Sequence, residues 1–323
     1  MEHSIWLWLG FLVFVAALLA ADLGLVNRRA REIGVAEALK LSAVYILIAA
    51  VFAGGVFYFL GREPGLAFVT GYLVEKSLSL DNIFVFVLIF SHFAVPAALQ
   101  QRALFWGITG ALVLRALMIL VGAALVAAFS WILYAFGLLL LASGVKMLLA
   151  AGAEPDLAEN RVLGFLRRRL RVTEDYEGTR FFVRRDSKLW VTPLFLVVVL
   201  IEICDVVFAV DSIPAIFAVT HDAFIVFTSN VFAVLGLRAL YFALAGMVHR
   251  FHYLKYGLSL VLVVIGVKML IADLYHVPTW LALVVTGVLI GGSVLVSMLR
   301  PSVEPAARGW VPGSPRAKPP KKD

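Results

Sequence analysis

The chain has 323 residues, of which 62% are hydrophobic and 15% are charged, and its mean hydropathy is +0.97. A soluble domain is nearer half apolar and about a quarter charged, so this composition indicates a lipid environment and excludes soluble enzymes. The net charge of +7 would favour a nucleic-acid partner in a soluble protein, but here the basic residues gather in loops and the tail, where they report membrane topology. We therefore expect no nucleic-acid partner.

Nine apolar runs follow one another, and each is long enough to cross a hydrocarbon core of about 30 Å as a helix. They cover residues 5–26, 37–60, 66–91, 103–128, 131–150, 190–219, 223–247, 256–273 and 278–299. No basic residue precedes the first run, whereas Arg28, Arg29 and Arg31 follow it directly, which is typical of a retained helix rather than a cleaved signal peptide. The sequence predicts an all-α integral membrane protein.

The loop charges predict its orientation. With the N-terminus outside, 22 of the 28 Lys and Arg residues fall in inner segments, whereas the outer segments hold Arg62 alone. This asymmetry predicts a multi-pass protein of the cell inner membrane, with the N-terminus outside and the C-terminus cytoplasmic. The basic inner loop, 151–189, is long enough for a short amphipathic helix; it is either an orientation signal and solvated linker or a regulatory or lipid-binding segment. The tail, 301–323, is rich in Pro, Gly and Lys and is predicted to be disordered.

An internal duplication is visible in three pairs of segments. Residues 75–83 (EKSLSLDNI) match 205–213 (DVVFAVDSI), the LRAL of 114–117 recurs at 237–240, and the GVKML of 144–148 recurs at 266–270. Because each unit holds three helices, the second copy must enter the membrane from the opposite side, which predicts the inverted-topology repeat common in secondary transporters. The expected parts are two N-terminal helices (1–60), repeat one (61–150), the basic loop, repeat two (190–275) and a last helix (276–300).

Acidic and polar residues within these helices are the candidate site. A charge at the membrane centre costs roughly 2.5–3.5 kcal/mol, so it persists mainly when it is paired or functional. Carboxylate, amide and hydroxyl oxygens suit manganese, calcium or magnesium, and the chain lacks the His or Cys clusters that zinc or copper would favour. The candidate metal residues are Glu75, Asp81 and Asn82 in the first motif, Glu202, Asp205, Asp211 and Ser212 in the second, and Asp22 near the inner end of the first helix.

Basic residues within the helices are the expected charge partners of these acids: Arg115, Arg238, Lys146 and Lys268, with Lys76 as a fifth intramembrane base. Arg115 and Arg238 occupy equivalent positions, and each suits a carboxylate of an acidic helix. Lys146 and Lys268 are expected toward opposite membrane faces, where they could snorkel or pair. Structural ion pairing alone is the competing interpretation of all these charges.

The local backbone at the motifs leaves two alternatives open. Pro214 follows the second motif and would free a carbonyl one turn earlier, near Val210. In a straight helix, Glu75 and Asp81 would not share a face. Either the helices unwind at the motifs, or the two acids serve sub-sites about 9 Å apart along the axis.

Over about residues 5–299, the sequence resembles the TerC family of membrane proteins, named for tellurium resistance. The resemblance rests on 75–84 (EKSLSLDNIF), on 202–215 (EICDVVFAVDSIPA) and on the paired LRAL and GVKML segments. It implies an all-helical fold with intramembrane acids, and in bacteria manganese export or metal supply to secreted enzymes; calcium or manganese roles are ascribed to related proteins. Tellurite is an anion that an acidic centre would repel, so the phenotype is a poor guide to the substrate.

The leading hypothesis is manganese(II) efflux by alternating access, with calcium as the other candidate ion and no permanently bound cofactor. The alternative is a non-transporting membrane partner that supplies metal to, or assembles with, secreted or membrane proteins. An intramembrane protease with Asp81 and Asp211 as its dyad is disfavoured because no GxGD-like segment accompanies either residue, so we expect no enzyme. The expected partners are the metal ion and the bilayer, with a homo-oligomer or a membrane-protein partner left open.

Overall fold

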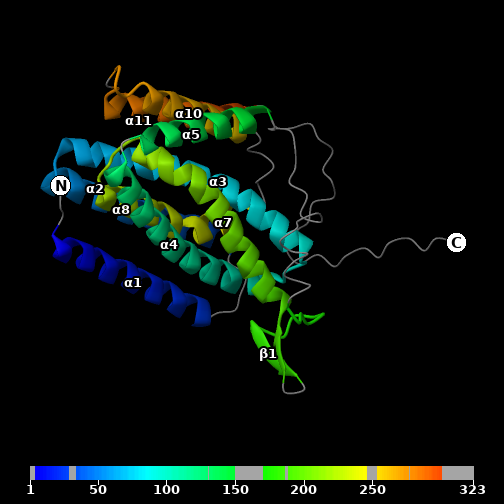
Figure 1. Cartoon of the computed structure of the whole chain (residues 1–323). Helices are drawn as coiled ribbons and strands as arrows, with labels where there is room; N and C mark the ends of the chain where they lie inside the picture. The colour runs from blue at the N-terminus through cyan, green and yellow to red at the C-terminus, as the bar shows by residue number, and fades with distance from the viewer. Residues whose placement is uncertain are drawn as a thin grey trace.

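The computed structural model describes residues 4–28, 34–129, 131–149, 170–185, 188–245, 253–275 and 277–299, without the side chains of residues 23–28, 80, 81 and 84. The predicted tail and the first part of the basic loop lie outside these ranges. The described chain is mainly helical, and Figure 1 shows the helices running side by side. The helices are α1 (Ile5–Arg28), α2 (Val35–Phe59), α3 (Arg62–His92), α4 (Ala97–Ala128), α5 (Ile132–Leu149), α7 (Pro193–Phe217), α8 (Ala223–Leu235), α9 (Leu237–Leu244), α10 (Leu254–Leu270) and α11 (Thr279–Leu299).

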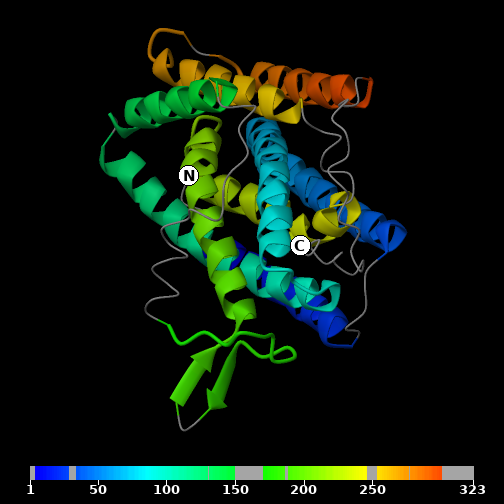
Figure 2. The same cartoon turned by 90° about the vertical axis from the view of Figure 1, so that its right-hand side faces the viewer.

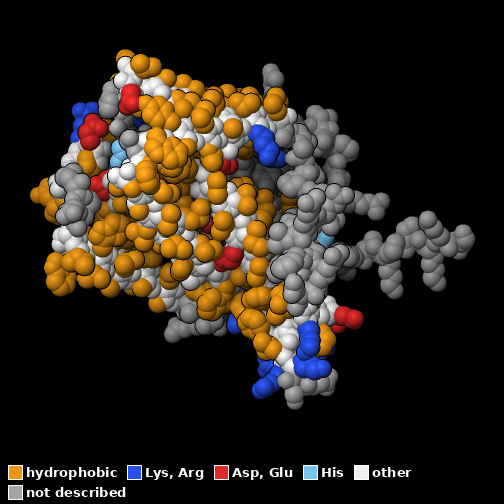
Figure 3. Space-filling model, in the orientation of Figure 1, with side chains coloured by type: hydrophobic (Ala, Val, Ile, Leu, Met, Phe, Trp, Pro, Cys, Tyr) orange, Lys and Arg blue, Asp and Glu red, His pale blue; other side chains and the backbone are white. Residues whose placement is uncertain are grey.

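Seven helical segments within the described residues are long and apolar enough to cross a membrane: α1, α2, α4, α5, α7, the α8–α9 segment and α11. They support a multi-pass membrane protein, and Figure 3 shows the largely hydrophobic surface that such helices present to lipid. Two other helices correspond to predicted spans. α3 has 31 residues but carries the charges of the first motif, and α10 has 17 residues.

Two helices differ from the expectation at the motifs. α3 and α7 both run unbroken through their acidic residues, with Pro214 inside α7, so the unwinding considered above is wrong. The predicted helix 223–247 is instead interrupted at Gly236, which separates α8 from α9. Asp222 caps the start of α8 because its Oδ1 accepts hydrogen bonds from the amides of Phe224 (3.0 Å) and Ile225 (3.3 Å).

The helices pack in pairs that link the two predicted repeats. α3 packs against α8, α4 against α7, and α5 against α10, and α3 also contacts α7. Figure 2 shows α5, α10 and α11 as one layer across the end of the other helices. The main core lies between α3, α4, α7 and α8, so it surrounds the acidic segments of α3 and α7.

A short hairpin precedes α7, an element that the sequence interpretation did not predict. β1 (Phe182–Arg185) pairs antiparallel with β2 (Lys188–Val191), and Thr192 then leads directly into α7. The hairpin lies within the described part of the basic loop, where an amphipathic helix had been considered.

Candidate metal site

Three buried charges meet where α3, α4 and α7 pack together. Arg115 of α4 donates two hydrogen bonds to Asp205 of α7, from Nε to Oδ2 at 2.8 Å and from Nη2 to Oδ1 at 2.7 Å. Its Nη1 donates to Oε1 of Glu75 in α3. The side chains are 1%, 2% and 0% exposed for Arg115, Asp205 and Glu75, so this guanidinium bridges two carboxylates that water does not reach. Glu75 and Asp205 are the equivalent acids of the two sequence motifs.

A stripe of unpaired oxygens extends from this bridge along α3. Glu75 Oε2, Ser79 Oγ and Asn82 Oδ1 are buried and have no hydrogen-bond partner. Their spacing of four and then three residues places them on one face of a continuous helix. An unsatisfied buried oxygen costs roughly 1–3 kcal/mol, so three on one face suit a bound cation or its water ligands. Ser212, also buried, lies beside Arg115, whose Nη1 donates to its Oγ at 3.4 Å.

Glu202 adds a further carboxylate one turn before Asp205 on α7. Its carboxyl group lies against the backbone of α4 at Gly110, in the space that a Cβ atom at position 110 would occupy. Its Oε2 is buried and has no hydrogen-bond partner. Gly110 therefore makes room for an acid close to the Arg115 bridge, a feature that the sequence interpretation missed because it considered only polar residues.

The remaining motif acids lie further along their helices. Asp211 accepts a hydrogen bond from Ser143 Oγ of α5 at 2.7 Å and is attracted electrostatically to Lys146, almost one turn further on α5. The backbone of Asp81 is part of α3, but its side chain lies outside the described residues. The continuous helices favour the second alternative above, in which the two acids of a motif serve separate positions along the axis.

Asp22 belongs to a separate ion pair. Arg238 of α9 donates from Nη2 to Oδ1 of Asp22 in α1, and Tyr45 of α2 also hydrogen-bonds Asp22. The expectation that Arg238 would pair with an acid of an acidic helix is therefore wrong. The sequence also gave no role to Lys76, whose Nζ donates to the carbonyl of Ala233 at 3.1 Å, near the end of α8.

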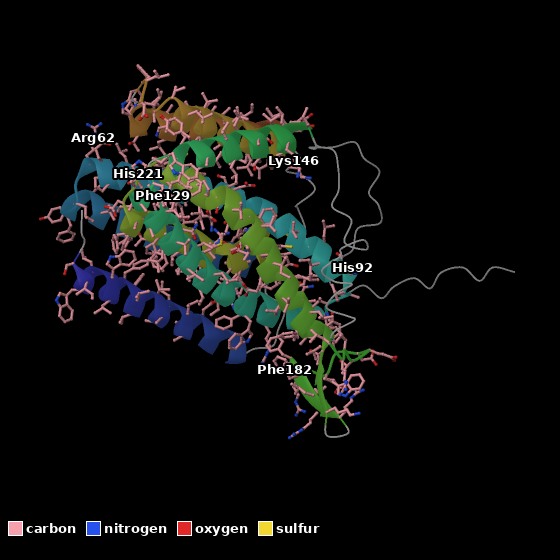
Figure 4. All side chains as sticks on the ribbon, in the orientation of Figure 1. Arg62, His92, Phe129, Lys146, Phe182 and His221 are labelled. Carbon is pink, nitrogen blue, oxygen red and sulfur yellow. The ribbon has the colours of Figure 1, made fainter. Side chains whose placement is uncertain are left out.

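Lys146 and Lys268 lie apart. Figure 4 shows Lys146 toward the end of the molecule that also holds His92, whereas His221 lies at the opposite end with Arg62. Lys268 lies close enough to His221 for its positive charge to act on that imidazole. Burial, and then this charge, lower the pKa of His221. The two lysines therefore lie toward opposite ends of the molecule.

Among the described side chains, no three His, Cys, Asp or Glu residues lie together in a way that could hold a metal ion. In this conformation, the positive charge between Glu75 and Asp205 is the guanidinium of Arg115. A cation could reach both acids only after that side chain has moved.

Comparison with known proteins identifies the family. The family model described as "Integral membrane protein TerC family" matches residues 60–304. The chain belongs to the TerC family. The match covers all of the residues above except Asp22 and Tyr45, and it confirms the resemblance inferred from the motifs.

Full-length relatives of this TerC protein are membrane proteins. It is 48% identical over 306 residues to an uncharacterized membrane protein of Myxococcus xanthus, covering 95% of this chain and 96% of the relative. It is 50% identical over 294 residues to a protein of Escherichia coli K12 named "Putative membrane-bound redox modulator Alx", covering 88% and 92%. No solved structure matches the chain.

Proposed function

We propose that this TerC protein moves a divalent cation, with manganese favoured, out of the cell through the centre of its helix bundle. The observation that carries the proposal is the buried pair of Glu75 and Asp205, brought together from the two sequence motifs. Two carboxylates match the charge of a divalent cation, and the unpaired oxygen of Ser79 adds a hard ligand about one helical turn from Glu75, while that of Asn82 lies nearly one turn further along α3.

The packing supports an inverted repeat as the framework of transport. In the proposed repeat, α3, α4 and α5 correspond to α7, α8–α9 and α10. The contact between α3 and α8 then corresponds to the contact between α7 and α4, and both contacts occur. The glycines of the two GVKML segments, Gly144 and Gly266, have equivalent backbone contacts. A Cβ on Gly144 would meet Ser259 O (2.8 Å) and Val263 N (2.9 Å), whereas one on Gly266 would meet Gly137 O (2.9 Å) and Leu141 N (2.8 Å). Residues 259 and 263 follow 137 and 141 by the same 122 positions that separate the glycines.

We further propose nine spans, with α3 and α10 added to the seven apolar segments. Both helices belong to these corresponding pairs; within α3, Glu75 is buried and Lys76 bonds the carbonyl of Ala233 in α8, so these two charges face other helices rather than lipid. In this arrangement the Glu75–Asp205 pair lies at the interface between the repeats, which is where inverted-repeat transporters bind their substrates.

In the proposed cycle, Arg115 and the cation exchange places. In the described conformation, the guanidinium compensates Glu75 and Asp205, which would otherwise carry two adjacent negative charges away from water. An arriving divalent cation binds the carboxylates as Arg115 withdraws, and after release on the other side the guanidinium returns. Arg115 thus keeps the empty site from holding uncompensated charge while the repeats rock between two orientations.

A second candidate is a membrane partner that binds metal without transporting it. It is favoured by the name of the Escherichia coli relative, which refers to redox modulation. Because this chain has a single cysteine, Cys204, it cannot form an intramolecular disulfide, so a redox role would act through a partner.

Reconstitution separates the two candidates. The purified protein is placed in liposomes that contain a manganese-quenched dye, and manganese entry is compared with binding to the same protein in detergent. If the protein transports manganese, manganese entry should saturate, and calcium or magnesium should reduce it in proportion to the affinity of the site for that ion. Zinc, which prefers softer ligands, is the control competitor. Saturable binding without entry would reject transport in favour of the partner role, and the absence of both would leave the acids as structural ion pairs.

A further inference from the structure

The hairpin before α7 presents a mixed basic and apolar face. Side chains alternate across an antiparallel pair, and the observed register sets Phe182 opposite Val191 and Arg184 opposite Leu189. Phe182, Arg184 and Leu189 therefore share one face, which we call the hairpin face. Phe182 is 48% exposed and Leu189 is 64% exposed, so two large apolar side chains flank the exposed guanidinium of Arg184.

The hairpin face contacts the first turn of a membrane helix. The ring of Phe182 packs on that of Phe195 in the first turn of α7, with ring centroids 4.8 Å apart. Figure 4 shows Phe182 at this junction. Phe195 is itself partly exposed. The apolar side of the hairpin therefore meets the first turn of α7, on the side of the helix that carries Glu202 two turns further on.

The position of the hairpin also suits the membrane interface. It projects beyond the helices at the α7 end in both Figures 1 and 2, and Figure 3 shows Lys and Arg side chains gathered there. The opposite hairpin face carries Arg185, which pairs with Glu177, and Lys188, together with the partly buried Val183 and Trp190. Aromatic and basic side chains at the end of a span are the combination that anchors proteins among lipid headgroups.

We propose that the hairpin face binds the anionic phospholipid headgroups of the inner leaflet. Phe182 and Leu189 enter the boundary between the headgroups and acyl chains beside α7, and Arg184 binds a lipid phosphate. This binding attaches the basic loop to the membrane at the start of the helix that carries Glu202, Asp205 and Asp211. It does not depend on the identity of the transported ion.

The register of the hairpin allows a test with matched neighbours. In a full-length chain carrying Cys204→Ser, a small fluorophore is attached at Leu189→Cys on the hairpin face or at Lys188→Cys on the opposite face. The protein is reconstituted in phosphatidylcholine vesicles with or without phosphatidylglycerol, and either lipid carries bromine as the quencher. We expect stronger quenching at position 189 than at 188, and stronger quenching by brominated phosphatidylglycerol than by brominated phosphatidylcholine.

Charge variants then separate specific binding from general attraction. Arg184→Gln should reduce the preference for phosphatidylglycerol at position 189 by about fivefold, whereas Arg184→Lys keeps most of it. Arg185→Gln removes the same charge from the opposite face and should have the smaller effect. Equal quenching at 188 and 189, or equal effects of Arg184→Gln and Arg185→Gln, would overturn the proposal. Mass spectrometry of lipids retained by the unlabelled parent and the Arg184→Gln protein gives the same comparison without cysteine substitutions.

Discussion

At the residue scale, the central interaction is that of Arg115, which compensates the charges of two buried carboxylates from different helices. Breaking a buried ion pair by removing one partner leaves an unpaired charge away from water. Arg115→Met should therefore destabilise the protein by about 3–5 kcal/mol, measured by unfolding in detergent or lipid. Adding Glu75→Gln and Asp205→Asn should recover most of the loss, because no buried charge then remains. A loss below about 1 kcal/mol for the single variant would mean that the carboxylates are already compensated in another way.

Gly110 offers a way to move one carboxylate without removing it. A methyl group at position 110 would occupy the space of the Glu202 carboxyl group, which is the flexible end of its side chain. Gly110→Ala should therefore fold but displace this carboxylate, and manganese binding should weaken by about tenfold, a value typical of lost metal-site support. The matched control is Gly291→Ala on α11, where an added Cβ meets nothing within 4 Å. Unchanged affinity in Gly110→Ala would remove Glu202 from the metal site.

The pairing of residues was only partly predictable. The spacing of the two motifs and the recurring LRAL segment correctly suggested Arg115 as the partner of a motif acid. The same reasoning failed for Arg238, because Asp22 comes from a helix outside the repeat, and no sequence pattern links α1 to α9. Glu202 was selected for its charge, but the glycine that accommodates it carries no polar signal.

At the element scale, the contact between α5 and α10 depends on two glycines. Cβ atoms on Gly144 and Gly266 would approach backbone atoms of the other helix to 2.8 Å, and backbone cannot rotate away as a side chain can. Gly144→Ala and Gly266→Ala should each destabilise the protein by about 1–3 kcal/mol, and by similar amounts, because they occupy equivalent places in the two proposed repeats. Unfolding measurements on both variants, with Gly291→Ala as the control, test this. A large cost at only one glycine would contradict the proposed symmetry.

The ends of the helices were easier to predict from the sequence than the breaks within them. The boundaries of the long helices were mostly predicted to within four residues, because the length of an apolar segment determines whether it spans the membrane, but α4 begins at Ala97 rather than at the predicted 103. Pro214 suggested a break in α7, yet the helix continues through it, as membrane helices often do when neighbouring groups satisfy the freed carbonyl. The break at Gly236 was missed. It coincides with the hydrogen bond from Lys76 to Ala233, a contact between helices far apart in the sequence.

At the scale of the whole molecule, the distribution of basic residues predicts orientation. Arg62 and His92 lie at opposite ends of α3, as Figure 4 shows. In cells expressing a Cys204→Ser chain, a membrane-impermeant thiol reagent should label Arg62→Cys directly and His92→Cys only after permeabilisation. The reverse result would invert the topology and, with it, the inferred direction of export.

The overall architecture was the most predictable feature, because composition and run length require membrane helices. The hairpin before α7 was missed because four-residue strands in a charged loop carry little periodicity. Three matched segments of the sequence predict a duplication, and the contacts of α3 with α8 and of α4 with α7 are those that the proposed repeat would produce.

The central claim, that a divalent cation crosses through the Glu75–Asp205 site, is tested most directly by manganese flux in liposomes containing Asp205→Asn or Asp22→Asn protein. Each variant removes one carboxylate charge from an arginine pair, buried for Asp205 and partly buried for Asp22, but only Asp205 belongs to the proposed path. We predict that Asp205→Asn abolishes flux while the protein still folds, and that Asp22→Asn retains most of it. Parental flux in Asp205→Asn protein, or equal loss in both variants, would contradict the account.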